Sequence, residues 1–309
     1  MHLRSDVDLN AAQVKRVIEL ALNVKAHPEQ YRKALDGKSV AVIFAKQSTR
    51  TRVSFEVGIF ELGGHALVLT SGGSSGMQMG RGETIHDTAK TLGRMVDAIV
   101  IRTYAQSDVD ELALHGGVPV VNALTDDYHP CQALADVQAI QERFGRTQGL
   151  KLVYAGAGNN VAHSLMLIGP RVGMDVVVAC PASVAPNAAI LARAQADAKE
   201  AGTSVTVSHD LADAVKGAHV IYTDTWVSMG QDADAQRLRE ELQAFQVNAK
   251  IMAAAQPDAV FMHCLPAHRG EEVTADVIDG PQSIVFDEAE NRLHAQKALL
   301  MLLMGAQPW

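Results

Sequence analysis

The sequence is poor in cysteine, with Cys131, Cys180 and Cys264 as the only three in 309 residues. They form no closely spaced pairs, which excludes a disulfide framework and, with 11 Met and 5% aromatic residues, suits a reducing cytosol. Proline is also sparse, at 10 residues, and glycine is not enriched, at 24. The chain is therefore neither collagen-like nor disordered, and its 48% hydrophobic residues suffice for buried cores.

Positive charge is in deficit as well. The chain has 27 Lys and Arg against 35 Asp and Glu, a net charge of −8, and a pI of about 5.8. This balance argues against a nonspecific polyanion binder, so we expect no nucleic-acid partner. An anionic ligand would need a local cluster of arginines.

Long apolar runs are absent too. Runs such as 176–180 and 298–304 are far shorter than the roughly 20 residues that cross a bilayer, so we expect no membrane span. The first six residues include charged side chains and lack the apolar core of a secretory signal. A cytoplasmic location is therefore expected.

Short Val- and Ile-rich runs alternate with longer segments of helical period. Continuous apolar runs are typical of strands covered on both faces, and their alternation with helices predicts parallel sheets. We expect two tandem α/β domains, each with a central, mainly parallel sheet flanked by helices. The expected strands are 40–44, 65–69, 97–101, 118–122, 151–155, 175–179, 204–207, 219–223 and 259–264.

The domain boundary is expected near residue 145. Apolar residues at helical spacing in 131–144, followed by Gly145, predict a joining helix. The domains would then be 1–145 and 146–287. Residues 288–305 predict a long C-terminal helix that packs back across the domains and returns to the first one.

The first candidate site is Ser48-Thr49-Arg50-Thr51-Arg52, which lies between an expected strand and an expected helix. A helix N-terminus presents free N–H groups and a positive dipole end, and the hydroxyls and guanidinium groups add donors. This predicts a phosphate site. It is not a Walker loop, because the Gly-rich spacing with Lys is absent. A solvated helix start with two surface arginines is the alternative.

A second group comprises Arg102, at the end of an expected strand, and His129 with Gln132, at the start of the joining helix. The carboxyl ends of parallel strands are where open sheets bind ligands, and His129 and Gln132 could both address a polarised carbonyl. A capping or structural His129 and a solvated Arg102 are the alternatives.

In the second half, Gly156-Ala157-Gly158 superficially resembles a dinucleotide fingerprint. Val161 occupies the third glycine position, however, and the next strand ends without an acidic residue, so NAD binding is disfavoured. The pair Asn159 and Asn160 instead suits a small zwitterionic ligand, with helix capping as the competing explanation.

Two further strand ends carry reactive groups. Asp224 and Cys264 each follow an expected strand, and a carboxylate and a thiol there could meet an amine. A zinc site from His263, Cys264 and His268 is one alternative, although no second spaced ligand pair is present. Cys264 as an acylated nucleophile is another.

Five segments in order resemble the aspartate/ornithine carbamoyltransferase family over essentially the whole chain, and the last three resemble its ornithine branch. A departure occurs at 155–158, where relatives commonly have Gly-Asp. The five segments are STRTR at 48–52, HPCQ at 129–132, DTWVSMG at 224–230, HCLPAHRG at 263–270 and FDEAENRLHAQKALL at 286–300.

The resemblance implies roles for individual residues. Ornithine would be held by Asn160, Asp224, Ser228 and Met229. Gln78 is similar to a glutamine that reaches into a neighbouring subunit's site, which implies a homo-oligomer, a trimer with shared active sites. Arg50, Arg102, His129 and Cys264 would be catalytic. Carbamoyl phosphate would be bound by Ser48, Thr49, Arg50, Thr51, Gln78, Arg102, His129, Gln132, Cys264, Leu265 and Arg292.

The reaction that the resemblance implies is attack by the neutral δ-amine of L-ornithine on carbamoyl phosphate, which gives L-citrulline and phosphate. No metal ion and no redox cofactor is needed. The alternatives are a sister carbamoyltransferase acting on putrescine or N-acetylornithine, and a catalytically silent ligand-binding subunit. A panel of amine substrates distinguishes them.

Overall fold

The computed structural model describes residues 1–70, 77, 79–80, 82–227 and 235–309. The chain divides into two compact units, which we call unit 1 (residues 1–138 and 290–309) and unit 2 (residues 139–289). The divisions fall inside helix α5 (Pro130–Phe144) and helix α12 (Val285–Leu303), so each of these helices contributes residues to both units. The sequence had placed the first division near 145, at the end of α5 rather than within it.

Unit 1 is built on a parallel sheet with the strand order β2-β1-β3-β4. The strands all run the same way, so their carboxyl ends meet at one edge. Most residues of the inner strands are fully buried, which explains the unbroken apolar runs in the sequence. The strands are β1 (Ser39–Phe44), β2 (His65–Thr70), β3 (Ala98–Arg102) and β4 (Val120–Leu124).

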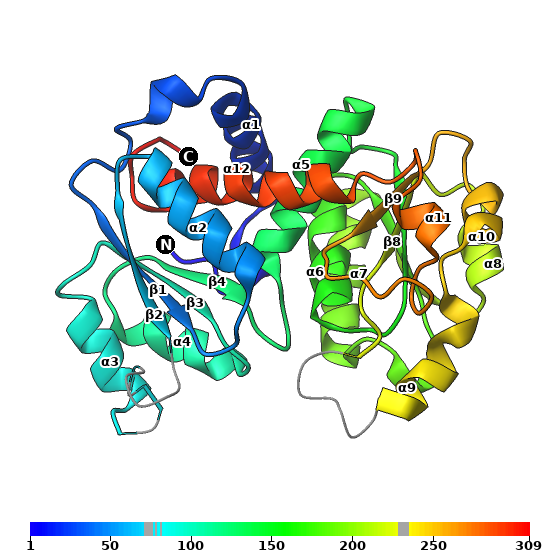
Figure 1. The fold of residues 1–309 in the computed structure, drawn as a ribbon, viewed down its shortest axis with the longest axis horizontal. Coiled ribbons are helices and arrows are strands. Elements are labelled where there is room, and N and C mark those ends of the chain that lie inside the picture. Colours follow the sequence, from blue (N-terminus) through cyan, green and yellow to red (C-terminus); the bar gives the residue numbers. More distant parts are fainter. Residues whose placement is uncertain (71–76, 78, 81, 228–234) are drawn as a thin grey trace. The chain divides into compact units, whose positions relative to one another are not determined.

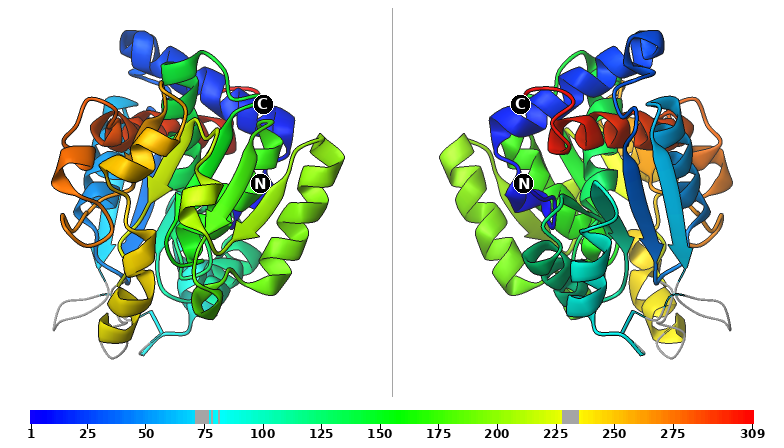
Figure 2. Two further views of the ribbon diagram at one scale, coloured as in Figure 1. Left: turned by 90° about the vertical axis from the view of Figure 1, so that its right-hand side faces the viewer. Right: turned by 90° about the vertical axis from the view of Figure 1, so that its left-hand side faces the viewer.

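Helices cover both faces of this sheet (Figure 1). Ala89, Val109 and Leu112 from α3 and α4 pack on Ile99 and Ile101 of β3. On the other side lie α2 and the unit 1 part of α12, with α1 beside α12, as Figure 2 also shows. The helices are α1 (Ala11–Ala26), α2 (Thr49–Glu61), α3 (Ile85–Leu92) and α4 (Gln106–His115).

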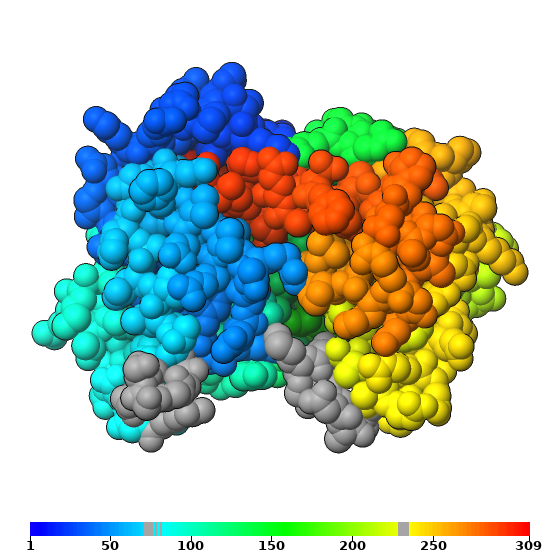
Figure 3. Space-filling view, viewed as in Figure 1, coloured from blue at the N-terminus to red at the C-terminus, as the bar shows by residue number. Residues whose placement is uncertain are grey.

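The contact between α2 and α12 is close, and the space-filling view shows their surfaces pressed together (Figure 3). A Cβ added at Gly58 would lie 3.1 Å from Cγ of Lys297 and 3.2 Å from Cδ1 of Leu293. A side chain at position 58 would therefore require Lys297 and Leu293 to shift by a few tenths of an ångström. Lys297 extends past it to an ion pair with Glu61, 2.6 Å from Nζ to Oε2. This packing fixes the C-terminal part of α12 against the helix that follows β1.

Unit 2 has a second parallel sheet, with the strand order β7-β6-β5-β8-β9. Again the carboxyl ends of the strands share one edge. Together the two sheets confirm the predicted fold class of two tandem α/β domains. The strands are β5 (Lys151–Ala155), β6 (Asp175–Ala179), β7 (Val205–Ser208), β8 (Val220–Thr223) and β9 (Val260–His263).

The helices of unit 2 lie on both faces of its sheet (Figures 1 and 2). One face is covered by α8, α10 and α11, whose apolar side chains pack on Val153, Ile221 and Phe261. The other is covered by α6 and α7. None of the described helices is long and apolar enough to cross a bilayer. The helices are α6 (Asn160–Arg171), α7 (Ala188–Ala201), α8 (Leu211–Ala214), α9 (Ala235–Leu242), α10 (Ala249–Ala254) and α11 (Ala275–Ile278).

Candidate active site

The carboxyl end of β1 leads directly into the N-terminus of α2, as the sequence predicted. Ser48 is the N-cap, and its Oγ accepts from the backbone N–H of Thr51 at 3.2 Å and lies 3.1 Å from Thr51 Oγ1. Thr49 is exposed and Arg50 is half-buried. Arg52, by contrast, is exposed and pairs with Glu56 at 3.2 Å. For this one residue the alternative explanation, a surface arginine, fits the structure. The first turn of α2 therefore offers N–H groups and one guanidinium to an anion.

His129 and Arg102 lie at the edge of the same sheet and are both buried, with 5% and 8% of their surface exposed. Burial first, and then the charges of Arg292, Arg102 and Arg50, lowers the pKa of His129 well below its usual value. The imidazole is thus neutral at neutral pH. A neutral ring can donate a hydrogen bond to a carbonyl oxygen without adding another charge to a cationic site.

Arg292 of α12 joins this group from far along the chain. Its Nη1 donates to Oε1 of Gln132 at 2.8 Å, and its Nη2 lies 3.4 Å from Oγ1 of Thr51. Gln132 in turn donates from Nε2 to Oδ1 of Asp136 at 2.8 Å. The predicted residues Thr51, Gln132 and Arg292 are therefore brought together inside unit 1.

A further cation, which the sequence motifs do not single out, lies in this region. Lys46 is 6% exposed, and its Nζ lies 3.0 Å from Oδ1 of Asp126 and 4.9 Å from the centroid of the Tyr104 ring. Its charge also contributes to the lowered pKa of His129. The available signal was position, because Lys46 stands two residues after β1 and two before Ser48.

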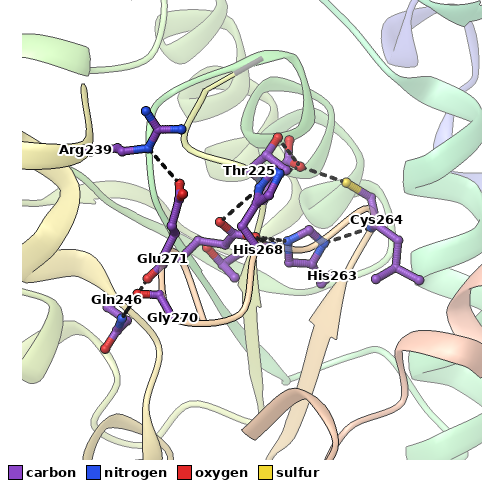
Figure 4. Close-up of polar contacts among 12 residues, drawn as sticks. Thr225, Arg239, Gln246, His263, Cys264, His268, Gly270 and Glu271 are labelled. Atoms are coloured by element: carbon purple, nitrogen blue, oxygen red, sulfur yellow. Dashed lines mark hydrogen bonds and ion pairs between the residues drawn. The ribbon is translucent and has the colours of Figure 1, made fainter. Parts of the chain in front are cut away.

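In unit 2, Asp224 and Cys264 follow the neighbouring strands β8 and β9, and the structure brings them into contact. The Sγ of Cys264 donates to Oδ1 of Asp224 at 3.1 Å, and the backbone N–H of Thr225 donates to the same oxygen at 2.7 Å (Figure 4). A carboxylate beside a thiol disfavours the thiolate, which is the nucleophilic form. The arrangement therefore speaks against Cys264 as an acylated nucleophile.

The two asparagines have different positions. Asn159 is the N-cap of α6, which confirms the capping explanation for this residue, and its Nδ2 also donates to Oδ2 of Asp224 at 2.9 Å. Asn160 is the first residue of α6 and is half-buried. No motif of the sequence links Asn159 with Asp224. Three other predicted residues lie outside the described part of the chain, namely Gln78, Ser228 and Met229.

His263 is fully buried, and both of its ring nitrogens are engaged. Nδ1 accepts from the backbone N–H of Leu265 at 2.8 Å, and Nε2 lies 3.3 Å from Oε1 of Glu272. A metal ion on either nitrogen would have to break one of these contacts, which argues against zinc bound by His263, Cys264 and His268. Figure 4 shows this chain of contacts. The bond from His263 also holds Leu265 in the left-handed region, at a φ of 56°.

Each unit is an α/β domain with a parallel sheet. Unit 1 has a cationic cluster, and unit 2 has a carboxylate and a thiol at adjoining strand ends. These features define an α/β protein that binds two small polar ligands. Residues 1–142 match the family described as "Aspartate/ornithine carbamoyltransferase, carbamoyl-P binding domain". Residues 148–303 match its "Asp/Orn binding domain". The chain belongs to the aspartate/ornithine carbamoyltransferase family.

Several individual proteins are similar over most of their length. The ornithine carbamoyltransferase of Thermococcus kodakarensis is 56% identical over 273 residues, which cover 88% of this chain and 86% of that protein. The anabolic ornithine carbamoyltransferase of Pyrococcus furiosus is 52% identical over 300 residues, which cover 96% and 94%. A solved structure of ornithine carbamoyltransferase from Pyrococcus furiosus superposes with a TM-score of 0.95 at 51% identity and covers 99% of this chain and 98% of that one.

Proposed function

We propose that this protein transfers the carbamoyl group of carbamoyl phosphate to the δ-amine of L-ornithine, which gives L-citrulline and phosphate. The observation that carries the proposal is the cluster of Lys46, Arg50, Arg102 and Arg292 around the neutral imidazole of His129. Such a cluster suits a ligand that has both a phosphate and a carbonyl. The names of relatives at 50% identity and above support the same reaction.

Carbamoyl phosphate is assigned to unit 1. Its phosphate would lie at the N-terminus of α2, on Ser48, Thr49 and Arg50, where N–H groups and the helix dipole favour an anion. Thr51, Arg102 and His129 would donate to the carbonyl oxygen, and Gln132 and Arg292 would complete the site. As negative charge develops on the carbonyl oxygen and the leaving phosphate, each correctly placed donor contributes roughly 10²-fold to 10³-fold in rate.

L-ornithine is assigned to unit 2, where Asp224 would bind an amino group, with Asn160, Ser228 and Met229 beside it. Cys264 and Leu265 would lie at the junction of the two ligands, with Cys264 beside the reacting δ-amine. The amine must be neutral to attack, whereas free amines of this type are protonated at neutral pH, so the site must favour the deprotonated form. The tetrahedral intermediate then releases phosphate, and the proposed route needs no metal ion and no cofactor.

A citrulline-formation assay with a panel of amines tests this proposal. We expect turnover with L-ornithine, and at least about a hundredfold less turnover with putrescine and N-acetylornithine. A pocket whose buried polar groups pair with the groups of one substrate rejects analogues that lack those groups. Equal or faster turnover with another amine would make the protein a sister carbamoyltransferase. Carbamoyl phosphate binding without turnover on any amine would make it a silent binding subunit.

We further propose a homotrimer with shared active sites. Val53, Val57 and Phe60 form an apolar stripe on the outer face of α2, and 54%, 38% and 78% of their surface is exposed, which suits an interface with a second copy of the chain. Gln78, which lies outside the described residues, would complete a neighbour's site. Mixing inactive Gln78→Ala and Arg102→Ala subunits should then restore activity, whereas verified hybrids no more active than their parents would contradict site sharing.

The biological setting follows from the proposed reaction. The product suggests a step in arginine biosynthesis, in line with the anabolic name of one relative. All three cysteines are free thiols, which suits a reducing compartment, and we place the protein in the cytoplasm. Cell fractionation and the arginine requirement of a deletion strain would check both assignments.

A further inference from the structure

The side-chain amide of Asn159 has a fixed orientation in unit 2. Its Oδ1 accepts from the backbone N–H groups of Val161 at 3.0 Å and Ala162 at 3.1 Å, and from the hydroxyl of Tyr154 at 3.1 Å. Only the amide oxygen can accept from N–H donors, so the oxygen and nitrogen cannot be exchanged. The Nδ2 group must therefore point away from the start of α6.

This Nδ2 points to the carboxylate of Asp224, which is held from both sides. Oδ2 accepts from Asn159 at 2.9 Å, whereas Oδ1 accepts from Cys264 at 3.1 Å and from the N–H of Thr225 at 2.7 Å. Asp224 is only 8% exposed. Donors on both oxygens set the rotation of the carboxylate.

The partner that holds Asn159 is itself immobilised by the core. Tyr154 is fully buried and stacks on Tyr222 with ring centroids 6.0 Å apart and an interplanar angle of 24°. Burial, and secondarily the charge of Asp224, raises the pKa of Tyr154 well above its usual value, so its hydroxyl remains a donor. The orientation of Asn159 is thus fixed by rigid β5 and by the first turn of α6.

The same network returns to Cys264. The hydroxyl of Tyr222 donates to Oε1 of Glu288 at 3.0 Å, and Oε2 of Glu288 accepts from the backbone N–H of His263 at 2.9 Å. His263 directly precedes Cys264. Asn159 and Cys264, the two side chains that flank Asp224, are therefore both connected to the stacked pair of tyrosines on β5 and β8. This connection fixes the distance between them.

We propose that Asn159 is a positioning residue for the reaction. It acts through Asp224, because it fixes the rotation of the carboxylate that receives the amino acid. Tyr154 holds the amide of Asn159 in place. The inference rests on the proposed function, in which Asp224 binds ornithine. Asn159 need not touch the substrate.

A purely structural role as helix cap is the rival explanation, and Asn159→Asp separates the two. Aspartate is as good an N-cap as asparagine, and it can still accept from Val161, Ala162 and Tyr154. It replaces the Nδ2 donor with an oxygen that faces Asp224. Asn248→Asp is the matched control, because Asn248 caps α10 of the same unit with the same contacts, from Lys250 N at 3.1 Å and Ile251 N at 3.2 Å.

In the citrulline assay, Asn159→Asp should lower kcat/KM for ornithine about tenfold or more, the usual cost of losing a hydrogen bond to a charged group. The acidic limb of its pH profile should move to higher pH for two reasons. In the variant, the carboxylates at positions 159 and 224 face each other and bind a proton between them, and the added negative charge favours the protonated form of the ornithine amine. The KM for carbamoyl phosphate should change by less than about twofold. Tyr154→Phe should act in the same direction but more weakly, and Asn248→Asp should behave as wild type.

Alkylation of Cys264 by iodoacetamide gives a readout that does not depend on turnover. Burial raises the pKa of Cys131 to about 12 and that of Cys180 to about 11, so between about pH 7 and 9 the half-buried Cys264 reacts first. At the alkaline end of this range, where the shared proton is lost, the added carboxylate brings negative charge close to Sγ and disfavours the thiolate, so Asn159→Asp should slow the reaction several-fold and Asn248→Asp should not.

The outcomes separate the two proposals. If the wild type forms no citrulline, the proposed function fails, and the thiol reactivity alone decides whether Asn159 controls Asp224. If the wild type is active but Asn159→Asp leaves the pH profile and the alkylation rate unchanged, the positioning role is wrong. A loss of thermal stability with an unchanged profile would likewise assign Asn159 to capping alone.

Discussion

Arg292 donates from Nη1 to Oε1 of Gln132 over 2.8 Å, although 160 positions separate the two residues in the sequence. Both side chains are almost fully buried, and the other terminal nitrogen of Arg292 faces Thr51. The contact therefore joins α12, α5 and α2 within unit 1. A guanidinium held in this way has its fork set before a ligand arrives, which lowers the entropy cost of binding.

Gln132→Met should test this preorganisation. The change removes both the oxygen that accepts from Nη1 of Arg292 and the donor to Asp136. We therefore expect a loss of about 1 to 3 kcal/mol in the free energy of unfolding and about tenfold weaker binding of carbamoyl phosphate. Urea titration and calorimetry would measure the two effects. Gln195→Met in unit 2, where Gln195 donates to the carbonyl of Val205 at 3.3 Å, is the matched control. Unchanged ligand affinity in Gln132→Met would contradict the assignment.

Arg50→Ala should abolish carbamoyl phosphate binding while leaving the fold intact, because a guanidinium at a helix N-terminus that is not fully buried serves a ligand rather than the core. Arg52→Ala is the internal control, since Arg52 lies on the same helix in an exposed pair with Glu56. Exposed pairs of this kind contribute little to stability. Calorimetry with carbamoyl phosphate should therefore distinguish the two variants, and equal affinities would refute the phosphate site.

The buried His129 should make the protein less stable in mild acid. Its pKa is lowered in the folded state, so below about pH 6.5 the unfolded chain takes up a proton that the folded chain does not. Stability should thus fall with decreasing pH by up to about 1.4 kcal/mol per unit from this residue.

Urea unfolding of the ligand-free protein between about pH 5 and 8 measures this slope. His129→Gln should flatten it, whereas His65→Gln, at an exposed position of β2, should leave it as in the wild type. A slope that His129→Gln does not alter would mean that the folded protein protonates His129 as readily as the unfolded chain.

Asp224→Asn should weaken ornithine binding and leave carbamoyl phosphate affinity unchanged, because we assign the two substrates to different units. Asparagine fills the same space but brings no negative charge to an amino group. Asp213→Asn, in the exposed pair with Lys216, controls for the charge change. Binding of each ligand would be followed by calorimetry. Comparable losses for both ligands would show that the assignment of substrates to units is incorrect.

Sequence alone determined the class and most of the local architecture. The apolar runs expected as strands at 97–101 and 151–155 correspond to β3 and β5, because an unbroken apolar segment of that length must be covered on both faces. Asn159 is an N-cap, in line with the capping explanation that the sequence offers, because a short polar side chain before a helix satisfies its first N–H groups. These features depend on residues that are close together in the chain, so the local sequence pattern is enough to predict them.

Tertiary structure decided what depends on distant segments. Lys46, Arg102 and Arg292 form one cationic group around the neutral His129 only because β1, β3, α5 and α12 converge in unit 1. No local pattern marks Lys46 as buried. The contact between Asn159 and Asp224 likewise joins segments 65 positions apart. Hydrogen bonds and charge interactions act across a few ångströms of space, whatever the separation along the chain, so only the folded protein fixes which side chains share a charge environment.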